Sequence, residues 1–169
     1  MAIEIERKFL LRDASWRDDV ARSVTMRQGY LAAQPGCSVR VRIEGETAAL
    51  NIKSATLGIE RQEFEYAIPR EDAQTMLRTL CGEHALSKVR HYVPHGNHTW
   101  EIDEFEGANA GLVVAEVELA SRDETFARPP WLGAEVSDDP RYYNVRLLEH
   151  PYRDWPVATR ESGFPRNDE

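Results

Sequence analysis

Short runs in which apolar and polar residues alternate recur along most of the chain, separated by turn-forming residues. Alternation with a period of two places successive side chains on opposite faces of a β-strand. Eight strands are therefore expected, over residues 3–9, 25–31, 39–43, 50–53, 63–66, 88–92, 100–103 and 115–119. Glu44-Gly45-Glu46 predicts the turn of a hairpin. Eight strands with mostly short connections favour an antiparallel sheet or barrel.

Helical periodicity is confined to three segments. Residues 71–80 carry an apolar stripe at helical spacing, and residues 13–20 predict a short helix. A third helix is expected near the C-terminus, capped by Asp138 or Asp139 and continuing through Leu147. The prediction is a mainly β fold with a few helices.

Composition narrows the class of protein. The 169 residues are 41% hydrophobic and 30% charged, which suits one globular domain. We expect that domain over residues 1–156 and a polar, frayed tail over 157–169. No apolar run approaches the roughly 18 residues of a membrane span, and the N-terminus resembles no signal or transit peptide. Two cysteines without a CxxC motif suit a reducing compartment, so a cytoplasmic location is expected.

Most of the polar positions on the predicted strands are ionised, and acids and bases are sorted by strand. The acids are Glu4, Glu6, Glu63, Glu65, Glu101, Asp103, Glu116 and Glu118. The bases are Lys8, Arg40, Arg42, Lys53, Arg61, Lys88 and Arg90. Because residues two apart share a strand face, these charges lie opposite the apolar face. A solvated sheet face explains any single strand, but such a face normally mixes Ser, Thr and Gln with the charges.

Like charges held close together repel unless something compensates them. A barrel closed around this face would therefore need a bound ligand to compensate the charges. Carboxylate pairs suit Mg²⁺ or Mn²⁺, and clustered Arg and Lys suit a polyanion. The residues thus predict a metal-bound polyphosphate ligand. The net charge of −8 argues against a broad nucleic-acid surface.

Glu4-Ile5-Glu6-Arg7-Lys8 resembles the ExExK signature of the CYTH, or triphosphate tunnel metalloenzyme, superfamily. The later charged pairs follow in the family's order to about residue 118, and residues 141–144 resemble its C-terminal segment. The resemblance implies an eight-stranded antiparallel closed barrel, helices packed outside it, and Mg²⁺- or Mn²⁺-dependent action on triphosphates. The run at residues 27–31 most resembles the small bacterial inorganic tripolyphosphatases.

Most of these acids are expected to bind metal, and most of the bases are expected to bind the triphosphate. Metal ligands are expected at Glu4, Glu6, Glu63, Glu65, Asp103, Glu116 and Glu118. Triphosphate contacts are expected from Lys8, Arg40, Arg42, Lys53, Lys88 and Arg90. Lys88, Glu4 and Glu6 are the expected catalytic group, with Lys88 either holding phosphate or helping to activate a water.

Three functional classes stay open. The first is a hydrolase that converts inorganic tripolyphosphate to pyrophosphate and phosphate, with thiamine triphosphate as a variant substrate. The second is a class IV-type adenylate cyclase, for which no base-binding motif is visible. The third is a non-catalytic polyphosphate-binding module, which has little use for four carboxylate pairs. We expect a small-molecule partner, no nucleic acid and no membrane, and leave open whether the protein is a homodimer.

Other residues carry weaker signals. His91, His95 and His98 have ligand-like spacing, but the Gly-Asn pair at 96–97 favours exposed histidines around a turn. Tyr30 is either a packed aromatic residue or a neighbour of the substrate. Both cysteines are expected to be structural.

Overall fold

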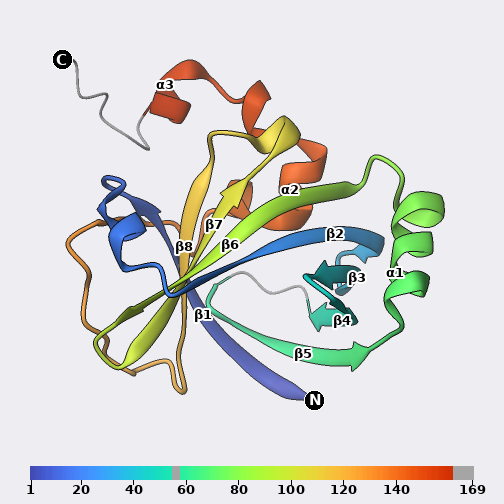
Figure 1. Ribbon diagram of the computed structural model, residues 1–169, viewed down its shortest axis with the longest axis horizontal. Helices are drawn as coiled ribbons and strands as arrows, with labels where there is room; N and C mark the ends of the chain where they lie inside the picture. The colour runs from blue at the N-terminus through green and yellow to red at the C-terminus, as the bar shows by residue number, and fades with distance from the viewer. Residues whose placement is uncertain (55–57, 162–169) are drawn as a thin grey trace.

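The computed structural model describes residues 1–54 and 58–161 (Figure 1). The strands are β1 (Ala2–Leu11), β2 (Arg22–Gln34), β3 (Cys37–Glu44), β4 (Thr47–Ser54), β5 (Glu60–Ala67), β6 (Ala85–His95), β7 (His98–Phe105), β8 (Val113–Glu118) and β9 (Leu132–Glu135). Within the described part of the chain, no helix has the length and apolar character that crossing a membrane requires.

The sheet closes because β1 pairs on both of its edges. The strand order is β5-β4-β3-β2-β6-β7-β8-β1-β9, and an additional β5–β1 pairing completes an antiparallel eight-stranded barrel. On the edge away from β8, β5 pairs with residues 2–5 of β1 and β9 pairs beyond them, at Phe9 and Leu11. The predicted closed barrel is confirmed, as is the hairpin turn between β3 and β4. Strand β9 was not predicted.

Helices lie outside the barrel wall or across one of its ends. They are η1 (Ser15–Asp19), α1 (Arg70–Met76), η2 (Leu77–Cys81), η3 (Gly107–Asn109), η4 (Pro140–Tyr142), α2 (Asn144–Glu149), η5 (Tyr152–Asp154) and α3 (Val157–Glu161).

The predicted helix over residues 71–80 is confirmed: it forms α1 and continues as η2, which is wound as a π-helix. The segment at 13–20 forms the 3₁₀ turn η1. The C-terminal prediction splits into η4 and α2, and the Asp139 carboxylate accepts from the Arg141 amide as the predicted cap. Part of the expected tail forms α3, and residues 162–169 lie outside the described residues.

Two apolar cores lie on the outer face of the barrel wall. The larger joins β1, β6, β7 and β8 to β9 and the loop before it; there Trp100 packs edge-on against Trp131, with ring centroids 5.6 Å apart. The smaller lies between β3 and β4 and the helices α1 and η2, where Val41 and Leu77 are buried. These cores bury the apolar face of the strands, so the ionised face turns inward.

A third apolar cluster closes one end of the barrel. On four strands, the inward residue two positions beyond a charged one is apolar: Leu10 after Lys8, Leu86 before Lys88, Phe105 after Asp103 and Val114 before Glu116. Tyr142, Leu147 and Trp155 from the C-terminal segment pack against these residues, and we call these three the C-terminal plug. The plug fixes η4 and α2 against the barrel end.

Candidate active site

The charged face of the strands lines the barrel interior. Lys8, Arg40, Lys53, Lys88, Arg90, Asp103 and Glu116 are buried there. Burying this many ionised groups is costly unless they are paired. Most of the pairing falls into three networks around the wall.

The first network spans β6, β7 and β8. Asp103 accepts hydrogen bonds from Lys88 Nζ and from Arg90 Nε, the latter at 2.7 Å. Glu116 lies 3.3 Å from Arg90 Nη2 and 3.1 Å from Lys8 Nζ. Burial lowers the pKa of Lys88 to about 8 even though Asp103 opposes the shift. Lys88 can therefore lose its proton at mildly alkaline pH.

The second network joins β1, β4 and β5. Lys53 Nζ lies 3.0 Å from Glu4 and 3.4 Å from Glu63. Arg61 Nε donates to Glu4 at 2.7 Å, and its Nη2 lies 3.9 Å from Glu6. Arg61 was given no role from the sequence, although alternation had already placed it on the charged face.

The third network lies on β3, β4 and β5. Arg42 Nη2 is 3.4 Å from Glu44 and 3.4 Å from Glu65, and Asn51 Nδ2 donates to Glu65 at 2.5 Å. The Glu65 side chain is 51% exposed. Arg42 and Glu65 are therefore paired with each other. Asp103, in contrast, is paired with Lys88 and Arg90.

Carboxylates are in excess where β1 meets β8. Glu6 lies opposite Glu118 in the strand register, and its carboxyl group hydrogen-bonds Glu116. Burial, Glu116 and Glu4 raise the pKa of Glu6 to about 8. Burial and the charges of Glu4 and Glu63 raise the pKa of Glu118.

This donor set fits a hard divalent cation, because carboxylate oxygens are the ligands such ions prefer. Among the described residues, no three His, Cys, Asp or Glu side chains already form a metal site. Binding would therefore have to draw these carboxylates together and displace the Glu6 proton.

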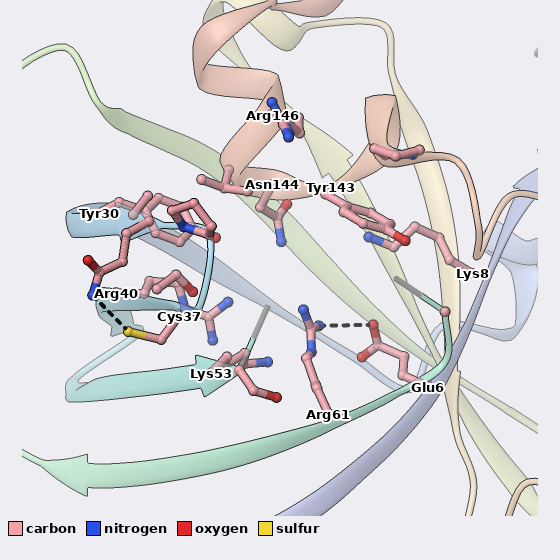
Figure 2. Close-up of a pocket in the computed structure, with 18 of the residues that line it drawn as sticks. Glu6, Lys8, Tyr30, Cys37, Arg40, Lys53, Arg61, Tyr143, Asn144 and Arg146 are labelled. Atoms are coloured by element: carbon pink, nitrogen blue, oxygen red, sulfur yellow. Dashed lines mark hydrogen bonds and ion pairs between the residues drawn. The ribbon is translucent and has the colours of Figure 1, made fainter. Parts of the chain in front are cut away.

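A cavity of about 610 Å³ opens beside these networks (Figure 2). Arg40, Lys53 and Arg61 line one side, whereas Lys8 contacts the C-terminal segment through the Tyr142 carbonyl. The opposite wall comes from the C-terminal segment and includes Tyr143, Asn144 and Arg146 (Figure 2). Arg42, Lys88 and Arg90 do not line the cavity, and neither do the predicted metal ligands other than Glu6.

Arg40 differs from the other predicted phosphate contacts. It is 6% exposed, and its Nε has no hydrogen-bond partner among the described residues. Burial lowers the pKa of Arg40, and the neighbouring positive charges of Arg42, Arg90 and Arg61 act in the same direction. Each of the other predicted contacts is within 3.5 Å of a carboxylate. Arg40 is therefore a buried cation that is available to bind an anionic ligand.

The weaker sequence signals have mixed outcomes. Tyr30 lines the cavity. His91 is largely buried rather than exposed: its Nδ1 lies 2.7 Å from Ser23 Oγ and its Nε2 3.1 Å from Glu104. His98 follows the turn at 96–97, but its side chain is also largely buried, at 13% exposed, and contacts Glu124. Both cysteines are free.

Tyr143, Asn144 and Arg146, on the C-terminal wall, are among the cavity residues for which no role was predicted from the sequence. They belong to a segment whose alternation is weak, and its place over the barrel end depends on the C-terminal plug. The usable signal was the likeness of residues 141–144 to the family's C-terminal segment.

The fold is a closed antiparallel barrel, and its interior holds a buried arginine that has no carboxylate partner among the described residues, which suits an anionic ligand. The chain belongs to the CYTH domain family, whose model matches residues 2–143.

Named relatives cover nearly the whole chain. It is 40% identical over 155 residues to an inorganic triphosphatase of Acetivibrio thermocellus, covering 92% of this chain and 99% of the relative. It is 36% identical over 149 residues to an inorganic triphosphatase of Nitrosomonas europaea, covering 85% and 95%. A crystal structure of an inorganic triphosphatase superposes with a TM-score of 0.65 at 32% identity, covering 88% of this chain and 95% of the other.

Proposed function

We propose that the protein is a divalent-metal-dependent inorganic triphosphatase that hydrolyses tripolyphosphate to pyrophosphate and phosphate. Arg40 is the observation that carries this proposal. A buried guanidinium with no carboxylate partner among the described residues, in a cavity that four further cations also line, calls for a ligand of high negative charge. The two relatives of 36–40% identity that carry the name inorganic triphosphatase support the same activity.

The cations of the cavity bind and orient the substrate. Arg40 and Arg61 offer planar donor pairs to phosphoryl oxygens, and Lys8 and Lys53 act as point charges. Lys53 and Arg61 share Glu4 when the site is empty, so phosphate binding redistributes existing ion pairs. Such positioning and electrostatic stabilisation supply most of the catalysis in phosphoryl transfer.

Mg²⁺ or Mn²⁺ would be held by Glu6, Glu118, Glu4 and Glu116. When bound, the cation would neutralise phosphoryl oxygens and lower the pKa of a coordinated water. Asp103, Glu63 and Glu65 are better explained by their contacts with interior polar and basic side chains, so we leave them out of the proposed ligand set.

Lys88 is assigned the exchange of a proton with the attacking water. Its lowered pKa of about 8 gives it a neutral fraction under mildly alkaline conditions, and Asp103 fixes its position. A chain of ion pairs connects Lys88 with the cavity: Asp103 joins Lys88 to Arg90, and Glu116 joins Arg90 to Lys8, which lines the cavity.

A specific feature of the cavity favours a second candidate. Beyond the cations, the lining includes Tyr30, Pro35 and Val145, which carry no charge. Its volume falls in the range of pockets that hold drug-sized organic ligands, about 300–1,000 Å³. An organic triphosphate, such as thiamine triphosphate or ATP, is therefore the alternative substrate.

Phosphate release and cyclic-AMP formation from tripolyphosphate, ATP and thiamine triphosphate, each with Mg²⁺, Mn²⁺ or excess EDTA, test the proposal. We expect the highest kcat/KM for tripolyphosphate and no turnover in EDTA. Full activity in EDTA would refute metal dependence. A higher kcat/KM for an organic triphosphate would favour the second candidate, and cyclic AMP would indicate a cyclase.

A further inference from the structure

The cavity wall opposite Arg40 and Arg61 presents the side-chain amide of Asn144. Asn144 is the first residue of α2 and lines the cavity. Its Oδ1 is buried without a hydrogen-bond partner among the described residues. An unpartnered buried amide oxygen costs stability. A side chain that makes no structural hydrogen bond at this oxygen is a candidate for a ligand contact.

The backbone around Asn144 is held firmly. Tyr143 Oη donates to the Ser137 carbonyl at 2.8 Å, and Lys8 Nζ donates to the Tyr142 carbonyl at 3.2 Å. Leu147, one turn further along α2, is fully buried in the C-terminal plug. The amide is therefore presented from a fixed position.

The direction of the side chain gives the chemistry of the contact. Figure 2 shows Asn144 reaching into the cavity toward the side that carries Arg40 and Arg61, with its nitrogen foremost. The amide nitrogen is a donor, and the guanidinium groups opposite it have donors only. Donors therefore converge on the same space from both walls. A fully ionised phosphate group is complementary to these donors, because its oxygens accept hydrogen bonds and donate none.

We propose that Asn144 is a substrate-contacting residue that donates a hydrogen bond from Nδ2 to a phosphoryl oxygen of the bound triphosphate. This inference rests on the proposed function, because it takes the cavity as the triphosphate site. The contact closes the binding site from the C-terminal segment, so that residues far apart in the sequence grip the substrate from opposite sides.

The test compares Asn144→Leu with wild type in tripolyphosphate binding by calorimetry and in steady-state kinetics. Losing one hydrogen bond to a charged group should weaken binding by about 10–100-fold. KM should rise with little change in kcat if the contact is equally strong in the ground and transition states. The melting temperature of the unliganded protein should be unchanged or higher, since an unpartnered polar group is removed.

Asn144→Asp is the second variant. Its carboxylate would face the cavity cations, so the unliganded protein should melt at a higher temperature while tripolyphosphate binds more weakly than to Asn144→Leu. These opposite changes would show that the side chain at position 144 faces the cavity cations, and Asn144→Leu tests the contact itself.

Asn109→Ala is the matched control. Asn109 is 3% exposed, and its Oδ1 accepts from the Tyr152 amide at 2.9 Å, outside the cavity. This change should lower the melting temperature and leave tripolyphosphate affinity within about twofold of wild type, because a satisfied structural hydrogen bond is lost.

The possible results distinguish failure of the Asn144 contact from failure of the proposed triphosphatase function. Unchanged affinity in Asn144→Leu, with a wild type that hydrolyses tripolyphosphate, would overturn the contact alone. So would a loss of unliganded stability equal to that of Asn109→Ala without a change in KM. A wild type that neither binds nor hydrolyses tripolyphosphate would overturn the proposed function and the contact together.

Discussion

Replacing Arg40 by methionine removes one buried positive charge and its donors while keeping an unbranched side chain of similar reach. Within residues 1–54 and 58–161, Arg40 has no carboxylate partner that the change would leave unpaired, and its charge is already disfavoured by burial and by Arg42, Arg90 and Arg61. The unliganded variant should therefore be as stable as wild type or more stable. Its binding of tripolyphosphate should suffer, because the proposed function makes Arg40 a principal phosphate contact.

The size of the loss follows from the charge of the contact. A hydrogen bond to a charged group contributes about 1.5–3 kcal/mol, so its removal weakens binding by about 10–150-fold. At a ligand concentration about 1,000-fold above the wild-type Kd, binding stabilises the wild type by about 4 kcal/mol. A variant that binds about 100-fold more weakly gains only about 1.4 kcal/mol. For a chain of this size the ligand-induced rise in Tm should fall from about 8–16 °C to about 3–6 °C.

Melting curves with and without tripolyphosphate measure both effects at once. Arg153→Met is the matched control, because the Arg153 side chain is 68% exposed on η5 and lies outside the cavity lining. It should show the wild-type shift. Equal ligand-induced shifts in Arg40→Met and wild type would refute the assignment of Arg40. A large fall in unliganded stability would show that its charge is compensated in the empty protein.

Three further changes have distinct expected outcomes. Arg42 is paired with carboxylates outside the cavity lining, so Arg42→Met should raise the tripolyphosphate Kd less than about tenfold, and a larger rise would mean that it contacts substrate. Burial, Glu116 and Glu4 raise the pKa of Glu6 from 4.5 to about 8, so the folded state keeps a proton that the unfolded state has lost within that range. Metal-free wild type should therefore lose stability relative to Glu6→Gln as pH rises through the range, by up to about 1.4 kcal/mol per pH unit; urea midpoints measure this, and a pH-independent difference would contradict it. Leu147 is fully buried in the C-terminal plug, so Leu147→Ala should cost about 2–5 kcal/mol in urea unfolding and raise KM, whereas a cost below about 1 kcal/mol would show that the plug is dispensable.

The strand faces were predictable because alternation acts locally. Wherever Val41 must pack outside, Arg40 and Arg42 must point inside, whatever the partner strand. Strand β9 escaped prediction because it has only four residues and contains Gly133. That glycine allows close approach to β1, since a Cβ there would come within 2.8 Å of the Leu10 carbonyl oxygen. Such a requirement comes from a neighbour more than a hundred residues away.

The sequence predicted which charges face inward better than it predicted their partners. The sequence predicts Lys88 and Arg90 as phosphate contacts together with Arg40, but Asp103 accepts from Lys88 and Arg90, whereas Arg40 Nε has no partner in the described part of the chain. Which cation finds a carboxylate depends on strand register and barrel stagger, and a single strand carries no information about either. Asn144 depends on a still longer-range feature, the packing of the C-terminal plug into the barrel end.

The location of the apolar cores explains how the barrel interior can remain charged. Small barrels usually fill their interior with apolar side chains, whereas here Trp100 and Leu77 belong to cores on the outer face. Much of the folding stability thus comes from layers outside the barrel wall. The interior can then keep Arg40, a cation without a carboxylate partner among the described residues, and a protonated acid such as Glu6, each of which disfavours the empty state. Ligand and metal would relieve both costs, so binding should stabilise this protein more than it would a barrel whose interior charges were already paired.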